Sequence, residues 1–232
     1  MSTFGTAPAA KAIARVASMG IDQNANAFLH DCFRQFGIQV VPAVGESTAL
    51  FNRQKFEACL LRLYDPAAEA ILSAARGSSS NRRMVIYGLA RSTQEALKFS
   101  SYGINAVIDE PLERQSVLRI VRATHLLVIH ELRRYVRVPV VSEVAISAQS
   151  RSFSGMSLEV SAGGMCVRGQ SSLASIEQVN VVLALPGAKK FSIRAFICWS
   201  RENEMLYGLR FDSNDENRVL VRNWIDQYLE IM

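Results

Sequence analysis

The pattern of apolar and polar positions divides the chain into two halves. Up to about Leu132, short apolar runs alternate with stretches in which apolar residues recur at helical spacing. Beyond Leu132, apolar residues recur at every second position, which is the period of a half-buried strand. This change of period predicts two domains, residues 1–131 and residues 132–232.

The first half contains five apolar runs of strand length, separated by helical patterns. The runs are KAIARVAS, IQVVPAV, FEACLLRL, RMVIYGLA and NAVID. Strands that alternate with helices favour a parallel sheet, because each helix returns the chain to the same edge and covers a face. We therefore predict an α/β unit with a doubly wound, five-stranded parallel sheet.

The last helix of this half is predicted to be long and to link the two domains. From Glu113 onward, the apolar residues with 3-then-4 spacing are Leu118, Val121, Val128 and Leu132, and His125 takes an intervening position. This is about two heptads, fewer than a coiled coil needs. Two interpretations stay open: packing against the sheet, or a stiff arm for dimerisation or for coupling to the second half.

Short alternating runs and turn-forming segments such as PGAKK make up the second half. The residues expected to face a core are Met156, Leu158, Val160, Phe191, Ile193, Ala195, Ile197, Trp199, Tyr207, Leu209 and Phe211. This pattern predicts a closed antiparallel β-barrel, in which no strand edge stays unpaired. A C-terminal helix follows, with a capping box from Ser213 to Glu216. Its apolar stripe comprises Val221, Trp224, Tyr228 and Met232.

Composition and charge narrow the classes of function. The chain has 232 residues, of which 49% are hydrophobic and 20% charged, enough apolar material for two cores. The net charge of +5 is spread evenly, so a small polyanionic ligand suits the chain better than a DNA duplex. The start lacks a signal-peptide pattern, and no apolar run approaches the roughly 20 residues of a membrane span. We expect a cytoplasmic protein with no DNA partner and no membrane span.

Cysteines and histidines offer little material for catalysis or metal binding. The cysteines form no C-x-x-C pair, and we expect buried free thiols at Cys32, Cys59, Cys166 and Cys198. The three histidines, all in the first half, are His30, His125 and His130. Neither a hydrolytic triad nor a metal cluster is suggested. We therefore expect no enzymatic activity, no catalytic residue, no metal and no cofactor.

Arginines cluster at the junction, in the stretch ELRRYVRVP at residues 131–139. Arg133 and Arg137 lie four residues apart with Arg134 between them, so two guanidinium groups can converge in a helix or in a strand. Guanidinium is a planar, permanently charged fork that suits phosphate oxygens and the N7/O6 edge of guanine. A solvated basic cluster is the alternative interpretation.

The segment FEACLLRLYDP, at residues 56–66, is similar to the pattern F-D-A-x-x-x-D-x-x-x-P, in which the second Asp is a phosphorylation site. Together with the order of strands and helices, it makes the first half resemble the receiver domain of bacterial response regulators over nearly its whole length. In that family, an aspartate at the end of the third strand accepts a phosphoryl group. Arg62 stands at this position, and an arginine cannot accept one.

Two further receiver positions are altered. The family's hydroxyl residue after the fourth strand falls on Gly88 or Leu89, and its lysine before a proline falls on Glu110. The resemblance therefore implies a degenerate scaffold that works without phosphorylation and meets a partner protein or a second copy of itself. Asp22 or Asp65, near the carboxyl ends of the strands, offers the alternative of a metal site.

Two motifs of the second half occur in a fixed order. An R-x-x-x-R phrase, Arg133 to Arg137, precedes the first strand, and a phrase of the type D/N-x-S-x-x-G, Glu159 to Gly164, ends the second. On an all-β pattern with a terminal helix, they make this half resemble the PilZ domain, a bacterial receptor module for cyclic di-GMP. The implied binding residues are Arg133, Arg134, Arg137, Glu159, Ser161, Gly163 and Gly164.

These residue types suit a ring with two phosphates and two guanines. Arginines balance its charge and stack on its bases, Ser161 offers a hydroxyl, and Gly163 and Gly164 let the backbone approach closely. Glu159 can accept hydrogen bonds from guanine but departs from the family's Asp or Asn. Its extra methylene moves the carboxylate outward and adds a rotor to immobilise, so the expected effect is weaker binding or its loss.

The leading hypothesis is a cytoplasmic cyclic di-GMP receptor in which ligand binding at the arginine hinge and the barrel changes the orientation of the receiver-like domain. An unidentified downstream protein would receive the signal, and a homodimer could form through the receiver-like domain or the long helix. The alternative is a ligand-independent adaptor in which both domains are degenerate. A DNA-binding regulator is disfavoured, because no helix-turn-helix follows the first half.

Overall fold

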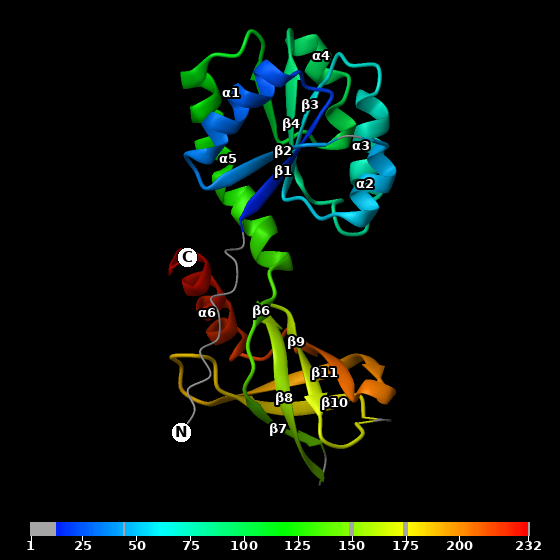
Figure 1. The fold of residues 1–232 in the computed structure, drawn as a ribbon, viewed down its shortest axis with the longest axis vertical. Helices are drawn as coiled ribbons and strands as arrows, with labels where there is room; N and C mark the ends of the chain where they lie inside the picture. The colour runs from blue at the N-terminus through cyan, green and yellow to red at the C-terminus, as the bar shows by residue number, and fades with distance from the viewer. Residues whose placement is uncertain (1–12, 44, 149–150, 174–175, 232) are drawn as a thin grey trace. The chain divides into compact units, whose positions relative to one another are not determined.

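The computed structural model describes residues 13–43, 45–148, 151–173 and 176–231. These residues form two compact units, Ile13–Leu132 and a second unit that begins at Arg133 (Figure 1). Each unit has its own secondary structure and its own core. Among the described residues, no helix combines the length and the apolar character that crossing a bilayer requires.

The first unit is built on five parallel strands in the order β2-β1-β3-β4-β5. The strands are β1 (Ala14–Met19), β2 (Ile38–Pro42), β3 (Ala58–Arg62), β4 (Val85–Ala90) and β5 (Ala106–Asp109). All six residues of β4 are buried, which explains why this strand reads as a continuous apolar run. The predicted doubly wound parallel sheet is confirmed.

Helices cover both faces of this sheet. They are α1 (Gln23–Arg34), α2 (Ser47–Arg53), α3 (Ala68–Gly77), α4 (Thr93–Leu97) and α5 (Arg114–Tyr135), with a short 3-10 helix at Ser100–Tyr102. One core cluster joins α1 and α5 to the sheet, and a second joins α2 and α3 to the opposite face (Figure 1). The buried residues of α5 include Val117, Val121 and Val128, so its apolar spacing serves this packing.

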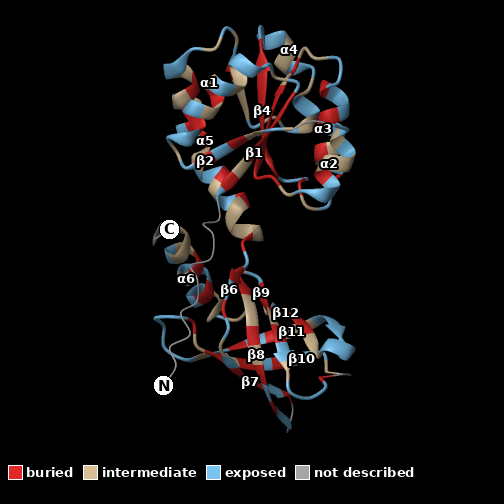
Figure 2. Ribbon diagram, in the orientation of Figure 1, coloured by how far each residue is buried: buried red, intermediate tan, exposed pale blue. Residues whose placement is uncertain are grey.

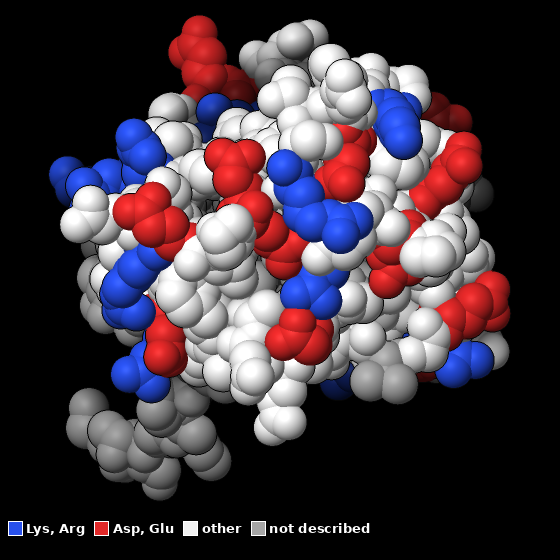
Figure 3. Space-filling view, turned by 90° about the horizontal axis from the view of Figure 1, so that it is seen from above, with Lys and Arg blue, Asp and Glu red and all other residues white. Residues whose placement is uncertain are grey.

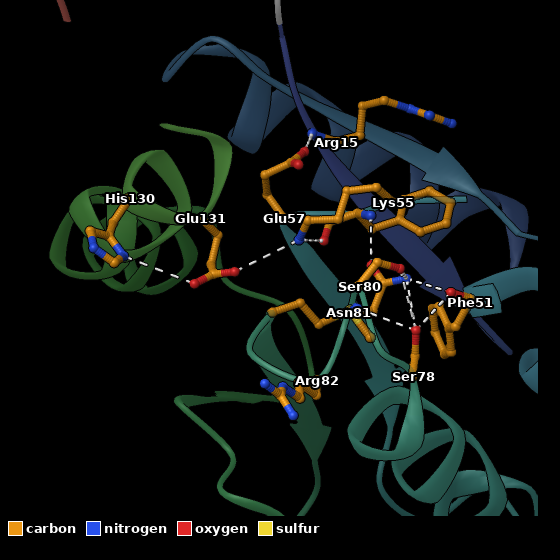
Figure 4. Close-up of polar contacts among 12 residues, drawn as sticks. Arg15, Phe51, Lys55, Glu57, Ser78, Ser80, Asn81, Arg82, His130 and Glu131 are labelled. Atoms are coloured by element: carbon orange, nitrogen blue, oxygen red, sulfur yellow. Dashed lines mark hydrogen bonds and ion pairs between the residues drawn. The ribbon is translucent and has the colours of Figure 1, made fainter. Parts of the chain in front are cut away.

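A buried polar cluster ties the loops below the sheet to one another (Figure 4). Asn81 is fully buried, and its Oδ1 accepts a hydrogen bond from the Phe56 amide at 2.8 Å. Its Nδ2 donates to the carbonyls of Phe51 at 2.7 Å and Gln54 at 2.8 Å. Buried backbone groups need hydrogen-bond partners, and the Asn81 side chain supplies them for three residues of the segment from α2 to β3. Nearby, the Lys55 ammonium lies 3.7 Å from the Glu131 carboxylate of α5.

The second unit is a closed antiparallel barrel, as predicted. Its elements are β6 (Val138–Pro139), β7 (Glu143–Ala148), β8 (Arg151–Ser161), β9 (Gly164–Gly169), β10 (Gln178–Leu183), β11 (Phe191–Arg201), β12 (Leu206–Phe211) and α6 (Arg218–Ile231), with a 3-10 helix at Glu202–Glu204. The strand order β8-β7-β10-β11-β12-β9 closes because β9 also pairs with β8, and β6 pairs with the far end of β8.

Two bulges shift the inward-facing positions away from those expected. Buried and exposed positions alternate along the strands (Figure 2), but β8 changes register between Ser157 and Glu159. Ser157 is fully buried there, whereas Met156 and Leu158 are only partly buried, so the inward assignment of these two residues was wrong. The Ser157 hydroxyl donates to the Val140 carbonyl and accepts from the Ser142 amide at 3.0 Å, which satisfies it inside the barrel.

The second bulge lies in β11, between Ile197 and Trp199. Ile193 and Ala195 face the core as expected, but beyond the bulge Trp199 is 47% exposed, which corrects its assignment to the core. The extra residue at a bulge re-aims the side chains that follow it. In β12, the expected core residues Tyr207, Leu209 and Phe211 are buried.

The C-terminal helix starts later than its expected capping box. α6 begins at Arg218, and just ahead of it Asp215 Oδ1 accepts a hydrogen bond from the Asn217 amide at 2.9 Å. Val221 and Ile225 of α6 are fully buried. Met232, the last member of the predicted stripe, lies outside the described residues.

The cysteines differ in exposure. Cys32 and Cys59 are buried free thiols, as expected, and burial raises the pKa of Cys59 to about 12. Cys166 is partly exposed and Cys198 is exposed, so the expectation of four buried thiols was wrong for this pair. Cys198 lies at the bulge of β11, and Cys166 lies on β9, where it pairs with Glu159 of β8.

Candidate functional site

A cavity of about 360 Å³ opens on the barrel beside the arginine stretch. Its lining comprises Arg134, Arg137, Glu159, Ser161, Gly163, Gly164, Met165, Cys166, Cys198, Trp199, Gly208, Leu209 and Arg210. The volume lies within the range of small-molecule sites. The lining comes from the end of α5, from the β8–β9 turn and from β11 and β12, so closure of the barrel assembles the cavity.

Six of the seven residues expected to bind ligand line this cavity, and the seventh does not. Arg133 is absent from the lining, and its Nε instead lies 2.9 Å from Oδ1 of Asp226 on α6. The cause is the length of α5, which runs through Tyr135 and places Arg133 and Arg134 in its last turn. Neighbouring residues on a helix project about 100° apart, so these two arginines point in different directions.

An ion pair spans the cavity. Arg137 Nε lies 3.6 Å from Glu159 Oε1, and the two side chains are 57% and 45% exposed. Both groups thus stay in contact with water, where such a pair is weak and can exchange partners. The charged members of the described lining are three arginines and one glutamate, which leaves two positive charges facing the cavity.

In the β8–β9 turn, Ser161 and Gly164 stabilise the fold, and Gly163 is open to the cavity. Ser161 is buried, and its hydroxyl donates to the Gly164 carbonyl at 3.0 Å, which closes the turn. A Cβ at Gly164 would lie 2.0 Å from the Leu209 carbonyl oxygen, so this glycine permits close packing of β9 on β12. A Cβ added at Gly163 would meet no described atom within 4 Å, so the surface of this glycine is open to the cavity.

Trp199 and Arg210 belong to the cavity although neither was expected there. Trp199 lies against Gly208, where an added Cβ would be 2.0 Å from the indole Nε1. The Arg201 guanidinium is 5.9 Å from the indole ring centroid. An exposed aromatic ring beside arginines is suited to stacking on a nucleobase. Strict alternation of apolar residues predicted Trp199 in the core, because a bulge does not change the apolar pattern of the sequence. Gly208, which leaves space for the indole on the neighbouring strand, is a signal of its true position.

The Cys166 thiol in the cavity wall stays protonated at neutral pH. Burial, and then the nearby Glu159 carboxylate, raise the pKa of Cys166. A neutral thiol is a poor nucleophile and a poor metal ligand. Cys166 therefore contributes packing surface to the cavity rather than charge.

At the carboxyl ends of the parallel strands, Arg62 forms ion pairs with two acidic residues. Arg62, the last residue of β3, pairs through Nη2 with Asp22 Oδ2 and through Nε with Glu110 Oε1 at 3.2 Å. Tyr64 donates to Glu110 Oε2 at 2.6 Å. The Ala25 amide, and then Arg62, lower the pKa of Asp22. On the face shown in Figure 3, acidic and basic side chains are interspersed rather than gathered by sign.

The fourth strand extends further than expected, and Asp22 and Asp65 at this edge of the sheet have partners within the chain. β4 runs to Ala90, so Gly88 and Leu89 lie inside the strand rather than after it. Asp65 accepts a hydrogen bond from the Ala67 amide at 2.8 Å. Within the ranges that the structure describes, no group of three or more His, Cys, Asp or Glu side chains could hold a metal ion.

Receiver domains are among the solved structures to which the chain is similar. Curated proteins give no match to the chain. Among solved structures, the chemotaxis response regulator CheY4 of Vibrio cholerae is 14% identical, with a TM-score of 0.43, over 48% of this chain and 98% of that one. A receiver domain protein from Methanospirillum hungatei is also 14% identical, with a TM-score of 0.43, over 51% and 96%.

A PilZ domain is also among the similar solved structures. The PilZ domain of CeSA from a cellulose-synthesizing bacterium is 18% identical, with a TM-score of 0.33, over 41% of this chain and 98% of that one. The PilZ domain family model matches residues 131–230, a stretch that contains both sequence motifs and the whole cavity lining. Residues 131–230 of this chain are therefore a PilZ domain.

Proposed function

We propose that the chain is a cytoplasmic receptor that binds cyclic di-GMP in the barrel cavity and catalyses no reaction. The observation that carries the proposal is the convergence of Arg134, Arg137, Glu159 and Gly163 on one cavity of a PilZ domain. The excess of two positive charges in the described lining matches the two phosphates of this ligand. Electrostatic complementarity of this kind favours both encounter and specificity.

Binding would exchange one ion pair for another. Arg137 would leave Glu159 for a ligand phosphate, where its guanidinium can form a two-pronged contact. The released Glu159 carboxylate would accept from the N1 and N2 hydrogens of a guanine. The indole of Trp199 would stack on a base, and Gly163 would let the ligand approach the turn without a Cβ in the way.

Titration calorimetry tests this proposal directly. Cyclic di-GMP should bind the full chain with micromolar or tighter affinity, and Arg137→Ala should weaken binding by about 1.5–3 kcal/mol, the range for a hydrogen bond to a charged group. Arg222→Ala is the matched control, because Arg222 is exposed on α6 and lies outside the cavity lining. Equal affinity of the wild type and Arg137→Ala would contradict the assignment of the site.

The first unit is proposed to be a scaffold that works without phosphorylation and meets a partner protein or a second copy of the chain. Arg62 supports this, because its guanidinium already pairs with Asp22 and Glu110 at the edge where receiver chemistry would occur. Ligand binding can shift the arrangement of the two units only by its difference in affinity for the arrangements. Incubation with acetyl phosphate should leave the mass of the protein unchanged; a phosphoryl adduct would overturn this part.

A ligand-independent adaptor is the second candidate. The Arg137–Glu159 pair favours it, since a site that neutralises its own arginine has less to gain from an anion. The two candidates differ in one measurement. No heat at high concentrations of cyclic di-GMP, alongside an intact fold by circular dichroism, would favour the adaptor.

A further inference from the structure

Arg133 stands in a contact that its sequence motif does not explain. Its Nε is 2.9 Å from Asp226 Oδ1, and the two side chains are 34% and 29% exposed. Partial burial makes this pair less accessible to water than the Arg137–Glu159 pair in the cavity. Asp226 follows the fully buried Ile225 on α6, so its position is fixed by the packing of that helix on the barrel.

The next residue along the chain, Arg134, lines the cavity. Arg133 and Arg134 share the last turn of α5, which ends at Tyr135. Last turns of helices fray readily, and a local unwinding of this turn would change the direction in which Arg133 projects. Two partners of the same chemistry could then compete for one guanidinium: the Asp226 carboxylate and a ligand phosphate.

We propose that Asp226 sets the ligand affinity of the PilZ domain by holding Arg133 away from the cavity. Binding would then exchange the Arg133–Asp226 pair for a contact between Arg133 and a phosphate. This inference rests on the proposed function and adds a regulatory residue that lies outside the cavity lining. Free energy used to separate Arg133 from Asp226 lowers the apparent affinity, because only the fraction of molecules with Arg133 released is competent for the added contact.

The exchange would also change α6. Val221 and Ile225 remain buried anchors, and the Trp224 indole donates to the Pro186 carbonyl at 2.9 Å, so the helix stays attached without the arginine. Its tie to the end of α5, however, is lost. Ligand binding would thus change the contacts of the C-terminal helix through one partly buried carboxylate, that of Asp226.

Calorimetry on four proteins tests the competition: the wild type, Asp226→Asn, Arg133→Ala and the double variant. Asp226→Asn keeps the side-chain shape and should bind cyclic di-GMP about twofold to fivefold more tightly, the range for ion pairs that keep some contact with water. Arg133→Ala should bind more weakly than the wild type. In the Arg133→Ala background, Asp226→Asn should have no further effect, which is the signature of a direct interaction in a double-mutant cycle.

Glu216→Gln serves as the charge-matched control, since Glu216 is exposed ahead of α6. It should leave affinity unchanged. In hydrogen exchange, amides of α6 should exchange faster when wild-type protein is saturated with cyclic di-GMP, and Asp226→Asn should show this faster exchange with or without ligand. This readout separates a ligand-dependent release from a static structural role.

The outcomes are distinguishable. If the wild type binds and neither Asp226→Asn nor Arg133→Ala changes affinity, the Arg133–Asp226 pair is a permanent tie, Arg134 serves as the first arginine of the site, and the inference is overturned. If Asp226→Asn tightens binding equally in both backgrounds, the effect is one of net charge and the competition is refuted. If the wild type gives no binding, the proposed function fails and takes this inference with it.

Discussion

Alanine at Gly164 should destabilise the barrel, whereas alanine at Gly163 should not. A Cβ at Gly164 would lie 2.0 Å from the Leu209 carbonyl oxygen and 3.1 Å from the Arg210 Cα. Carbon atoms in favourable contact are about 3.5–4.0 Å apart. Both obstacles are backbone atoms of β12, which pairs with β9 through Arg210 and Gly164, so a rotamer change cannot relieve them. Overpacking of this kind typically costs about 1–3 kcal/mol.

Gly163 provides the matched comparison on the same turn. A methyl group there meets no described atom within 4 Å, and removing a glycine restricts the unfolded chain. The free energy of unfolding should therefore stay unchanged or rise by about 0.4–1 kcal/mol. The free energies of unfolding of the two variants should differ by about 1–4 kcal/mol, with Gly164→Ala the less stable.

Tryptophan fluorescence gives an assay specific to this unit. The chain has 2 tryptophans, Trp199 and Trp224, and both lie in the second unit. A loss of 1 kcal/mol lowers the midpoint of thermal unfolding by about 4–8 °C in a domain of this size. Equal midpoints for the two variants, or a lower midpoint for Gly163→Ala, would refute the geometric reasoning.

Three other changes test separate parts of the molecule. Ser157→Ala leaves buried partners of its hydroxyl unsatisfied, so the same fluorescence assay should show a loss of about 1–3 kcal/mol. Glu159→Asp shortens the side chain paired with Arg137 and should tighten cyclic di-GMP binding by about twofold to fivefold in calorimetry. The Ala25 amide and then Arg62 lower the pKa of Asp22, so the stabilisation by this carboxylate is complete above its unfolded pKa and is lost as the pH falls through its folded pKa. Asp22→Asn should remove this part of the acid dependence of unfolding followed by circular dichroism.

Each of these expectations has a contrary result. Unchanged stability of Ser157→Ala would mean that water replaces the hydroxyl. Weaker binding by Glu159→Asp would mean that the ligand needs the longer side chain. An identical acid profile for Asp22→Asn would mean that the carboxylate is no better stabilised in the folded chain than in the unfolded one.

Local periodicity was enough to predict both sheets, because the number and type of strands depend mainly on burial of alternating or continuous apolar residues. It could not predict which side chains face the core in a strand that contains a bulge. Met156 and Trp199 show this: each sits in a strand whose register shifts at a bulge. A bulge is decided by pairing with a partner strand far along the chain, and one strand's own pattern carries no record of it.

The site was predicted better by its motifs than by geometry. The resemblance carried by the two motifs grouped Arg134, Arg137 and Glu159, and all three line one cavity in the structure. The placement of Arg133 depended on how far α5 continues, which helix boundaries read from sequence do not resolve. Its partner Asp226 lies 93 positions further on in a helix whose docking is tertiary, and no local signal connects the two.

The strand β8 pairs with three neighbours, β7 along its first part and β6 and β9 along its second. Glu159 and Ser161 therefore lie at the junction of β8 and β9, the pairing that closes the barrel. A ligand bound at this junction would contact the strands on both sides of it. The midpoint of thermal unfolding of the barrel would therefore rise with the ligand concentration. Separation of β8 from its neighbours would then open the barrel and abolish ligand binding at the same time.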